Sequence, residues 1–177
     1  MRHNFQIINV FLKNLGRKTF KLDLAKILGS GRGKFLYKLF LNRELCAVTG
    51  IQFGVPLYIG KSTDLIDRLY RHFKGMCPEY IYCENMEKGK MLYDMLKALD
   101  APQHILDNLY KYVDFEVDDI TETDVNLTDY ENENIQAFEN RFGHRPILNK
   151  RTEPTINVNK TLVRKFFEFT TKETISE

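Results

Sequence analysis

The spacing of apolar positions changes along the chain, and the two periods that occur predict a protein of mixed helices and strands. Apolar residues three and four positions apart predict helices over residues 4–15, 22–28, 63–73, 86–99, 102–112, 129–142 and 162–169. Alternating or short β-branched and aromatic runs predict strands over residues 35–41, 46–49, 56–59 and 113–120. No internal repeat or low-complexity linker interrupts this order.

Glycine and capping residues mark the ends of several of these elements. Residues 29–34 (GSGRGK) predict a basic, glycine-rich turn before the first of these strands, and Asn42 begins the turn after it. Thr63 or Asp64 can cap the helix predicted over residues 63–73, and Gly75 lies just past its end.

The composition describes one domain with room for an arm. The chain has 177 residues, of which 43% are hydrophobic, so it can bury a core and is not disordered throughout. It has no run of about 18 apolar residues and no secretory pattern, so we expect a cytoplasmic protein without a membrane-spanning segment. Three cysteines are too few for a disulfide scaffold, and the spacing of Cys77 and Cys83 to His72 or His104 matches no standard zinc site.

Charge is unevenly distributed along the chain, although the net charge is only +2. Residues 1–35 carry eight Lys and Arg residues against one acidic residue, and residues 141–177 carry eight against four. Residues 111–140 carry one basic residue against ten acidic ones. Two basic ends around an acidic middle indicate a polyanion such as nucleic acid as a partner of the ends, and a cation as a partner of the middle. Solvated surface charge is the alternative interpretation.

The most informative segment is residues 57–73 (LYIGKSTDLIDRLYRHF), in which a strand, a glycine turn and a helix follow one another. Gly60, Lys61 and Ser62 before a helix suggest a phosphate-binding P-loop. That loop needs a glycine five residues before Gly60, where this chain has Val55. The register therefore fails, and we expect no nucleotide cofactor.

The same segment carries side chains suited to the hydrolysis of a phosphodiester. Tyr58 ends the strand, and Arg68 and His72 are four residues apart, so they share one face of the following helix. The reaction needs a group that orients or deprotonates water and positive charge near the phosphorane oxygens. The planar guanidinium of Arg68 matches a phosphate, and Lys61 adds charge nearby. Each residue alone is more often a core or surface residue, so the combination carries the interpretation.

This segment resembles the GIY-YIG nuclease family. Residues 58–60 (YIG) match the second signature of that family, and Arg68 follows at the spacing of its arginine. His72 matches a histidine that occurs in several homing and restriction members. Residues 35–37 (FLY) fit the first signature best, with Tyr37 in the position of its tyrosine.

The two signatures lie farther apart here than the dozen or so residues usual in the family, because Tyr58 follows Tyr37 by 21 residues. We expect a hairpin insertion across residues 42–54 to account for the difference. Residues 50–52 (GIQ) are an alternative first signature, but they lack the tyrosine and lie too close to Tyr58.

The family also has a metal-binding glutamate on a later helix and an asparagine after a proline. Residues 130–138 (YENENIQAF) resemble that helix, which places Glu131 as the metal ligand. Residues 145–149 (RPILN) resemble the closing segment, so the resemblance implies that Asn149 braces the site.

Glu133 and Glu139 are alternative metal ligands. Glu131 lies so far before Asn149 that its assignment requires an insertion across residues 139–144. The resemblance implies Mg²⁺ as the ion, with Mn²⁺ able to replace it, because hard cations bind carboxylates and water.

The resemblance implies roles for the other site residues. Tyr58 or Tyr37 would orient or deprotonate the attacking water, and Arg68 would hold the scissile phosphate. His72 would assist proton movement or adjust a tyrosine, and Lys61 would add positive charge beside them.

The resemblance also implies the fold class α/β (α+β), with a small central antiparallel sheet flanked by helices. The nuclease-like domain would occupy residues 35–150, with a helical insertion at residues 74–110. Residues 1–34 would form a basic helical N-terminal arm, and residues 151–177 a basic C-terminal extension.

The implied substrate is double-stranded DNA held by the basic ends of the chain. The expected DNA-binding residues are Arg17, Lys18, Lys21, Lys26, Arg32 and Lys34 in the arm, and Lys150 and Arg151 after the domain. Compact size and basic ends resemble the small type II restriction endonucleases of the family, which favours a homodimer on palindromic sites. A phage or mobile-element nuclease and a non-catalytic DNA-binding protein on the same fold are the alternatives.

Overall fold

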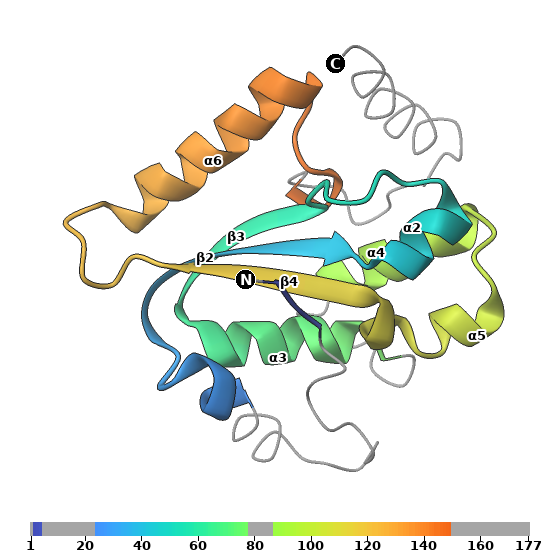
Figure 1. Ribbon diagram of the computed structural model, residues 1–177, viewed down its shortest axis with the longest axis horizontal. Coiled ribbons are helices and arrows are strands. Elements are labelled where there is room, and N and C mark those ends of the chain that lie inside the picture. Colours follow the sequence, from blue (N-terminus) through green and yellow to red (C-terminus); the bar gives the residue numbers. More distant parts are fainter. Residues whose placement is uncertain (1, 5–23, 78–86, 150–177) are drawn as a thin grey trace.

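The computed structural model describes residues 2–4, 24–77 and 87–149 of the chain. This part forms a mixed α/β fold around a four-stranded antiparallel sheet (Figure 1). The strands are β1 (Arg2–Asn4), β2 (Arg32–Leu41), β3 (Tyr58–Asp64) and β4 (Val113–Asp119), in the spatial order β1-β4-β2-β3. The expected small antiparallel sheet is therefore confirmed.

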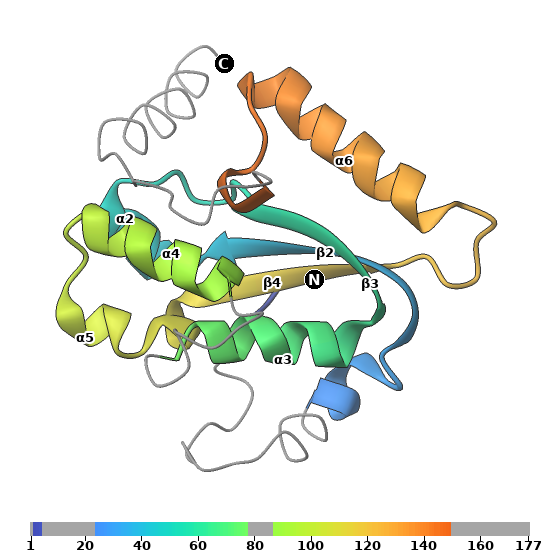
Figure 2. The same ribbon diagram turned by 180° about the vertical axis from the view of Figure 1, so that it is seen from behind.

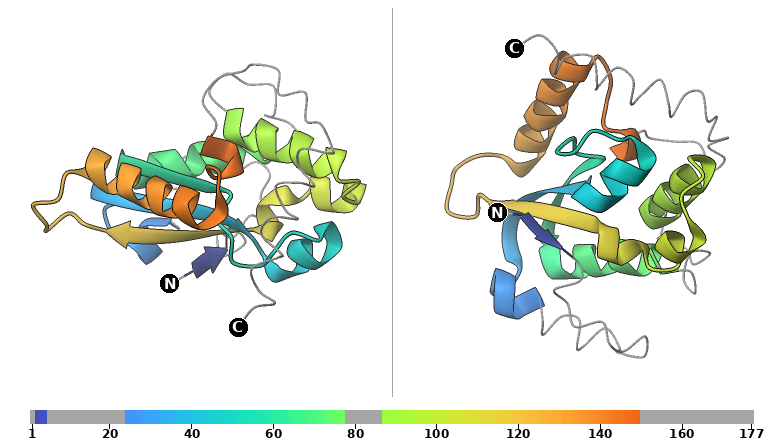
Figure 3. Two further views of the ribbon diagram at one scale, coloured as in Figure 1. Left: turned by 90° about the horizontal axis from the view of Figure 1, so that it is seen from above. Right: turned by 45° about the vertical axis from the view of Figure 1, so that its right-hand side comes forward.

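Helices flank this sheet. They are α2 (Arg43–Thr49), α3 (Leu65–Gly75), α4 (Glu87–Ala98), α5 (Gln103–Leu106) and α6 (Leu127–Phe142), with 3-10 helices η3 (Leu109–Tyr112) and η4 (Ile147–Asn149). α3 packs on β2 and β3, and α4 packs on α3 (Figure 2). α6 runs along the β3 side of the sheet (Figure 1, Figure 3). Among the described residues, no helix combines the length and apolar character that crossing a membrane would require.

β2 is the central structural element of the core. It pairs with β4 on one edge and with β3 on the other, and residues 35–37 and 39–41 within it are buried. Burial of apolar area at about 25 cal/mol per Å² makes such a strand a main source of stability. The strands and helices that carry the candidate site residues are therefore fixed to a buried scaffold.

The segment between β2 and β3 differs from its prediction. A strand over residues 46–49 and a hairpin insertion over residues 42–54 are both wrong, because the chain forms α2 here. Asn42 caps this helix, since its Oδ1 accepts a hydrogen bond from Leu45 N at 2.9 Å. Gly50 ends it in the left-handed conformation at φ 72°. These two end signals outweigh the β propensity of the residues between them.

Other boundaries shift for local reasons. β3 begins at Tyr58, two residues after Pro56, and extends to Asp64, which pairs with Arg32 of β2. The predicted helix over residues 102–112 is divided into α5 and η3. Asn108 interrupts it, since its side-chain amide donates to the His104 carbonyl oxygen at 3.1 Å and so competes with a helical backbone bond.

The expected helical N-terminal arm is only partly correct. Residues 24–28 are helical as predicted, but Arg2–Asn4 form β1, which pairs with β4. The predicted turn is shorter than residues 29–34, because β2 already begins at Arg32. Several predictions lie outside the described residues: most of the helix over residues 4–15, the helix over residues 162–169, and the candidate DNA-binding residues Arg17, Lys18, Lys21, Lys150 and Arg151.

Candidate active site

The antiparallel pairing of β2 and β3 brings Tyr37 and Tyr58 together. Tyr37 lies opposite Gly60, and Leu39 lies opposite Tyr58, so the two tyrosines share one face of the sheet. Their ring centroids are 5.8 Å apart. A Cβ atom at Gly60 would lie 2.5 Å from Cε1 of Tyr58 and 2.8 Å from Oη of Tyr37. The absence of a side chain at Gly60 therefore makes room for both rings.

α3 begins directly after β3 and carries Arg68 and His72 to these tyrosines. Arg68 Nε donates a hydrogen bond to Tyr37 Oη at 2.9 Å, and Arg68 Nη2 donates to Tyr58 Oη at 3.3 Å. One turn later, His72 Nε2 lies 2.8 Å from Tyr37 Oη. The four-residue spacing seen in the sequence thus places both side chains against the same phenol.

Burial sets the protonation of this cluster. Tyr37 is fully buried, and burial together with Tyr58 raises its pKa well above the ordinary value, although Arg68 offsets part of the effect. Burial, followed by the charges of Arg68, Lys88 and Arg71, lowers the pKa of His72 to about 3. At neutral pH, Tyr37 is therefore a neutral phenol and His72 a neutral imidazole.

Arg68 keeps its charge in this environment. Burial lowers its pKa, but the phenols of Tyr37 and Tyr58 outweigh burial and raise the pKa above its ordinary value. A guanidinium has five N–H donors, and the two bonds to the phenols use two of them. Arg68 thus presents a fixed positive charge with donors left for an incoming anion.

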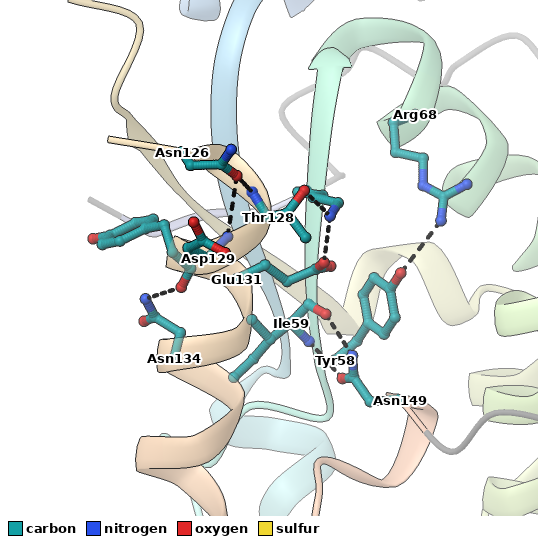
Figure 4. A network of polar contacts seen from close by, with 11 residues as sticks. Tyr58, Ile59, Arg68, Asn126, Thr128, Asp129, Glu131, Asn134 and Asn149 are labelled. Atoms are coloured by element: carbon teal, nitrogen blue, oxygen red, sulfur yellow. Dashed lines mark hydrogen bonds and ion pairs between the residues drawn. The ribbon is translucent and has the colours of Figure 1, made fainter. Parts of the chain in front are cut away.

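Glu131 reaches β3 from the first turns of α6. Its Oε2 lies 3.2 Å from Lys61 Nζ, and Lys61 Nζ also donates to Thr128 Oγ1 at 2.7 Å. Figure 4 shows Glu131 extending from α6 towards β3. In the same view, Tyr58 of β3 is bonded to Arg68 of α3. The structure therefore brings Lys61 and Glu131 together as an ion pair, a contact that the sequence did not indicate.

Asn149 lies in η4 and holds the edge of β3. Its Oδ1 accepts from Ile59 N at 2.8 Å, and its Nδ2 donates to the Ile59 carbonyl oxygen at 2.6 Å (Figure 4). The side-chain amide thus replaces a neighbouring strand at the residue that follows Tyr58. The position of Asn149 fits a residue that fixes Tyr58 by way of the backbone.

Two cavities adjoin these side chains. One, of about 400 Å³, is lined by Tyr58, Lys88, Glu131, Asn132, Ile135, Arg145 and Asn149. The other, of about 660 Å³, is lined by Lys34, Lys61, Ser62, Thr63, Asp64, Asp67, Arg68, Arg71, Asn126, Leu127 and Thr128. Since Lys61 lines one cavity and Glu131 the other, their ion pair lies between the two.

The carboxylates of α6 differ in their surroundings. Glu133 is exposed, and Glu139 accepts a bond from Arg145 Nε at 2.6 Å. Glu131 alone of the three lines a cavity shared with Tyr58. One carboxylate at an open cavity suits Mg²⁺, which keeps several waters and binds through one or two protein carboxylates. The described residues contain no cluster of three or more His, Cys, Asp or Glu side chains that could hold a metal.

The described part of the chain contains three of the expected DNA-binding residues. Lys34 lines the larger cavity, and its Nζ donates to the Thr123 and Val125 carbonyl oxygens at 2.6 and 3.3 Å. Lys26 and Arg32 are exposed. Lys88 lines the smaller cavity but was not expected there, because it lies in the segment predicted to be an insertion.

No protein family model, curated protein or solved structure matches the chain.

Proposed function

We propose that the protein is a metal-dependent DNA endonuclease that hydrolyses phosphodiester bonds. One observation carries the proposal: Tyr37, Tyr58, Arg68 and His72 form one hydrogen-bonded cluster, and Tyr58 shares a cavity with Glu131. Burying polar side chains costs free energy, whereas apolar side chains could fill the same space without that cost. Perturbed titratable groups beside a cavity are typical of catalytic sites.

Arg68 binds the scissile phosphate. Its guanidinium is held in place by the two phenols, so little side-chain entropy is lost when a phosphate oxygen docks. The charge on the phosphate oxygens increases as the attacking oxygen approaches. A fixed cation therefore stabilises the transition state more than the ground state.

Tyr58 orients or deprotonates the attacking water, whereas Tyr37 positions the cluster. Tyr58 is 7% exposed and lines the cavity beside Glu131, so it is the tyrosine of the two that borders a space a substrate can enter. Tyr37 is 0% exposed, and its raised pKa keeps the phenol protonated. A buried neutral phenol cannot take a proton from water in the cavity, but it can hold Arg68 through the bond to Nε.

His72 fixes the proton of Tyr37. A neutral imidazole has one nitrogen that accepts a hydrogen bond, and His72 Nε2 faces the Tyr37 hydroxyl. With Arg68 Nε donating to the same oxygen, the phenol hydrogen is directed to His72. The pair therefore keeps Arg68 aligned.

Glu131 would hold the divalent cation, with Asn149 keeping β3 in place beside it. When bound, the cation supplies Lewis-acid stabilisation of the charge on the phosphate and on the leaving oxygen. Lys61 neutralises the Glu131 carboxylate in the structure described here. Lys61 also lines the larger cavity, so a neighbouring phosphate can draw its ammonium away from Glu131.

The two cavities support a DNA backbone as the substrate. They lie on either side of the Lys61–Glu131 pair, so the path that we propose for one DNA strand passes over both. Four basic residues line the larger one against two acidic residues, Asp64 and Asp67, and Asp67 pairs with Arg71 at 2.9 Å, so its lining is net positive. The four are Lys34, Lys61, Arg68 and Arg71. Within this activity we propose a sequence-specific restriction endonuclease acting on double-stranded DNA as a homodimer, with a phage or mobile-element nuclease as the second candidate.

A plasmid-cleavage assay tests the proposal. The protein is expected to cut supercoiled plasmid with Mg²⁺ or Mn²⁺ and to leave it intact with a chelator. Glu131→Gln should abolish most cleavage, and Glu133→Gln on the same helix should cut near the wild-type rate. If Glu133→Gln abolished cleavage and Glu131→Gln did not, Glu133 would be the metal ligand. Defined fragments would favour a restriction enzyme, and a smear would favour a nuclease of low specificity. DNA binding without cleavage would favour a non-catalytic DNA-binding protein on the same fold.

A further inference from the structure

α4 is attached to the candidate active site by a very close helix contact. Gly89 of α4 is buried against Gly75 at the end of α3, and a Cβ atom at Gly89 would overlap the Gly75 backbone. Glycine at such a crossing lets two helix backbones approach more closely than side chains allow. The position of α4 is therefore determined by the same helix that carries Arg68 and His72.

This contact places the neighbouring residue, Lys88, beside the site. Lys88 is half-buried, and its Nζ lies 5.7 Å from the centroid of the Tyr58 ring. It lines the smaller cavity together with Glu131 and Asn149. An ammonium at this distance from an aromatic face makes a cation–π contact. α4 thus forms part of the site wall.

The electrostatics of the cluster show the same proximity. The charge of Lys88 is one of the causes that lower the pKa of His72, after burial and Arg68. Lys88 therefore acts on the groups around Tyr58 from the α4 side, in addition to Arg68 from α3.

We propose that Lys88 is a phosphate-binding residue of the active site, which contacts the substrate phosphodiester in the cavity between Tyr58 and Glu131. This inference rests on the proposed nuclease function and adds a residue to it. The reason is charge: Lys61 and Arg68 line the larger cavity, whereas Lys88 and Arg145 are the basic residues that line the smaller one, and Lys88 is the one beside the Tyr58 ring. Lys88 therefore brings positive charge to a phosphate from the smaller cavity, where charge on the oxygens increases during hydrolysis.

The test compares three full-length variants with the wild type. Lys88→Met removes the charge and keeps the length of the side chain, and Lys88→Arg restores a cation. Lys90→Met is the matched control, because Lys90 is exposed on the same helix and pairs with Asp94. Single-turnover cleavage of a plasmid with Mg²⁺ is measured for each. Binding of a fluorescent DNA duplex without Mg²⁺ is measured over a range of salt concentrations, and circular dichroism verifies folding.

Lys88→Met is expected to cut about 10²-fold more slowly, with Lys88→Arg recovering most of the rate and Lys90→Met unchanged. The slope of log K against log salt should become shallower by about one in Lys88→Met. Wild-type cleavage by Lys88→Met, or an equal loss in Lys88→Arg, would overturn the inference and leave the nuclease proposal intact. If the wild type cuts no DNA, the nuclease proposal fails. In that case the salt dependence of DNA binding alone tests the role of Lys88. A slope that is the same in Lys88→Met and in the wild type would overturn that role.

Discussion

Tyr37 Oη lies 2.8 Å from His72 Nε2, and both side chains are buried where α3 packs on β2. The bond joins a phenol whose pKa is raised to an imidazole whose pKa is lowered to about 3. Each partner is therefore held neutral. Protonation of His72 would place a charge next to Arg68 and remove the acceptor of the Tyr37 proton.

His72 makes the folded protein sensitive to acid. Its pKa is about 3 in the folded state and about 6.5 in the unfolded chain. Between these values the unfolded chain binds the extra proton, so the free energy of unfolding falls as pH decreases from about 6.5 towards 3. For this residue the fall is about 0.7 kcal/mol per pH unit at about pH 6.5 and approaches about 1.4 kcal/mol per pH unit by about pH 5. His72→Gln should flatten the dependence by that amount, as measured by urea denaturation at about pH 7, 6 and 5. Parallel curves for the two proteins would contradict the assignment.

The two tyrosines should differ in their effect on the chemical step. Tyr58→Phe removes the hydroxyl that accepts from Arg68 Nη2, on the tyrosine that lines the cavity, and is expected to lower the single-turnover cleavage rate by about 10²- to 10⁴-fold. Tyr37→Phe removes the acceptor for Arg68 Nε and should lower stability by about 1–3 kcal/mol, with a smaller loss of rate per folded molecule. A larger rate loss in Tyr37→Phe would assign the water-activating role to Tyr37.

Gly60 should tolerate no side chain. Gly60→Ala places a Cβ atom against both tyrosine rings, so we expect a loss of about 1–3 kcal/mol in stability and a large loss of cleavage. Gly143→Ala is the matched control, since Gly143 ends α6 at φ 73° with open space around it. That control should lose some stability but keep its rate per folded molecule. Equal rates for the two variants would show that Gly60 does not shape the site.

The Lys61–Glu131 pair should compete with metal binding. Lys61→Met leaves Glu131 without its cation, so Mn²⁺ should bind several-fold more tightly to the DNA-free protein, as measured by calorimetry or electron paramagnetic resonance. Lys38→Met is the matched control, because Lys38 forms an ion pair with Asp118 at 3.9 Å on another part of the sheet. An unchanged Mn²⁺ affinity in Lys61→Met would place the metal elsewhere than at Glu131.

The parts of the fold with a regular hydrophobic period could be predicted. β2, α3, β4 and α6 lie within a few residues of their predicted bounds. α2 was missed because Cys46–Thr49 has strand-like composition, although Asn42 and Gly50 mark the ends of a helix. The spacing of these two capping residues was the sequence signal that could have predicted α2.

The local part of the site could also be predicted, since Tyr58, Arg68 and His72 lie in one strand–helix unit. Contacts between distant segments could not. Lys61 meets Glu131 only because α6 docks beside β3, and Lys88 reaches Tyr58 only because Gly89 packs on Gly75. Such contacts depend on helix packing, which no local pattern encodes.

The most direct measurement is the single-turnover rate of DNA cleavage by Arg68→Ala with Mg²⁺, compared with the wild type. The wild type is expected to cut plasmid DNA, and Arg68→Ala should cut about 10²- to 10³-fold more slowly while its circular dichroism spectrum remains that of a folded protein. Cleavage by a folded Arg68→Ala variant at the wild-type rate, or an intact plasmid with the wild type under every divalent metal, would contradict the account.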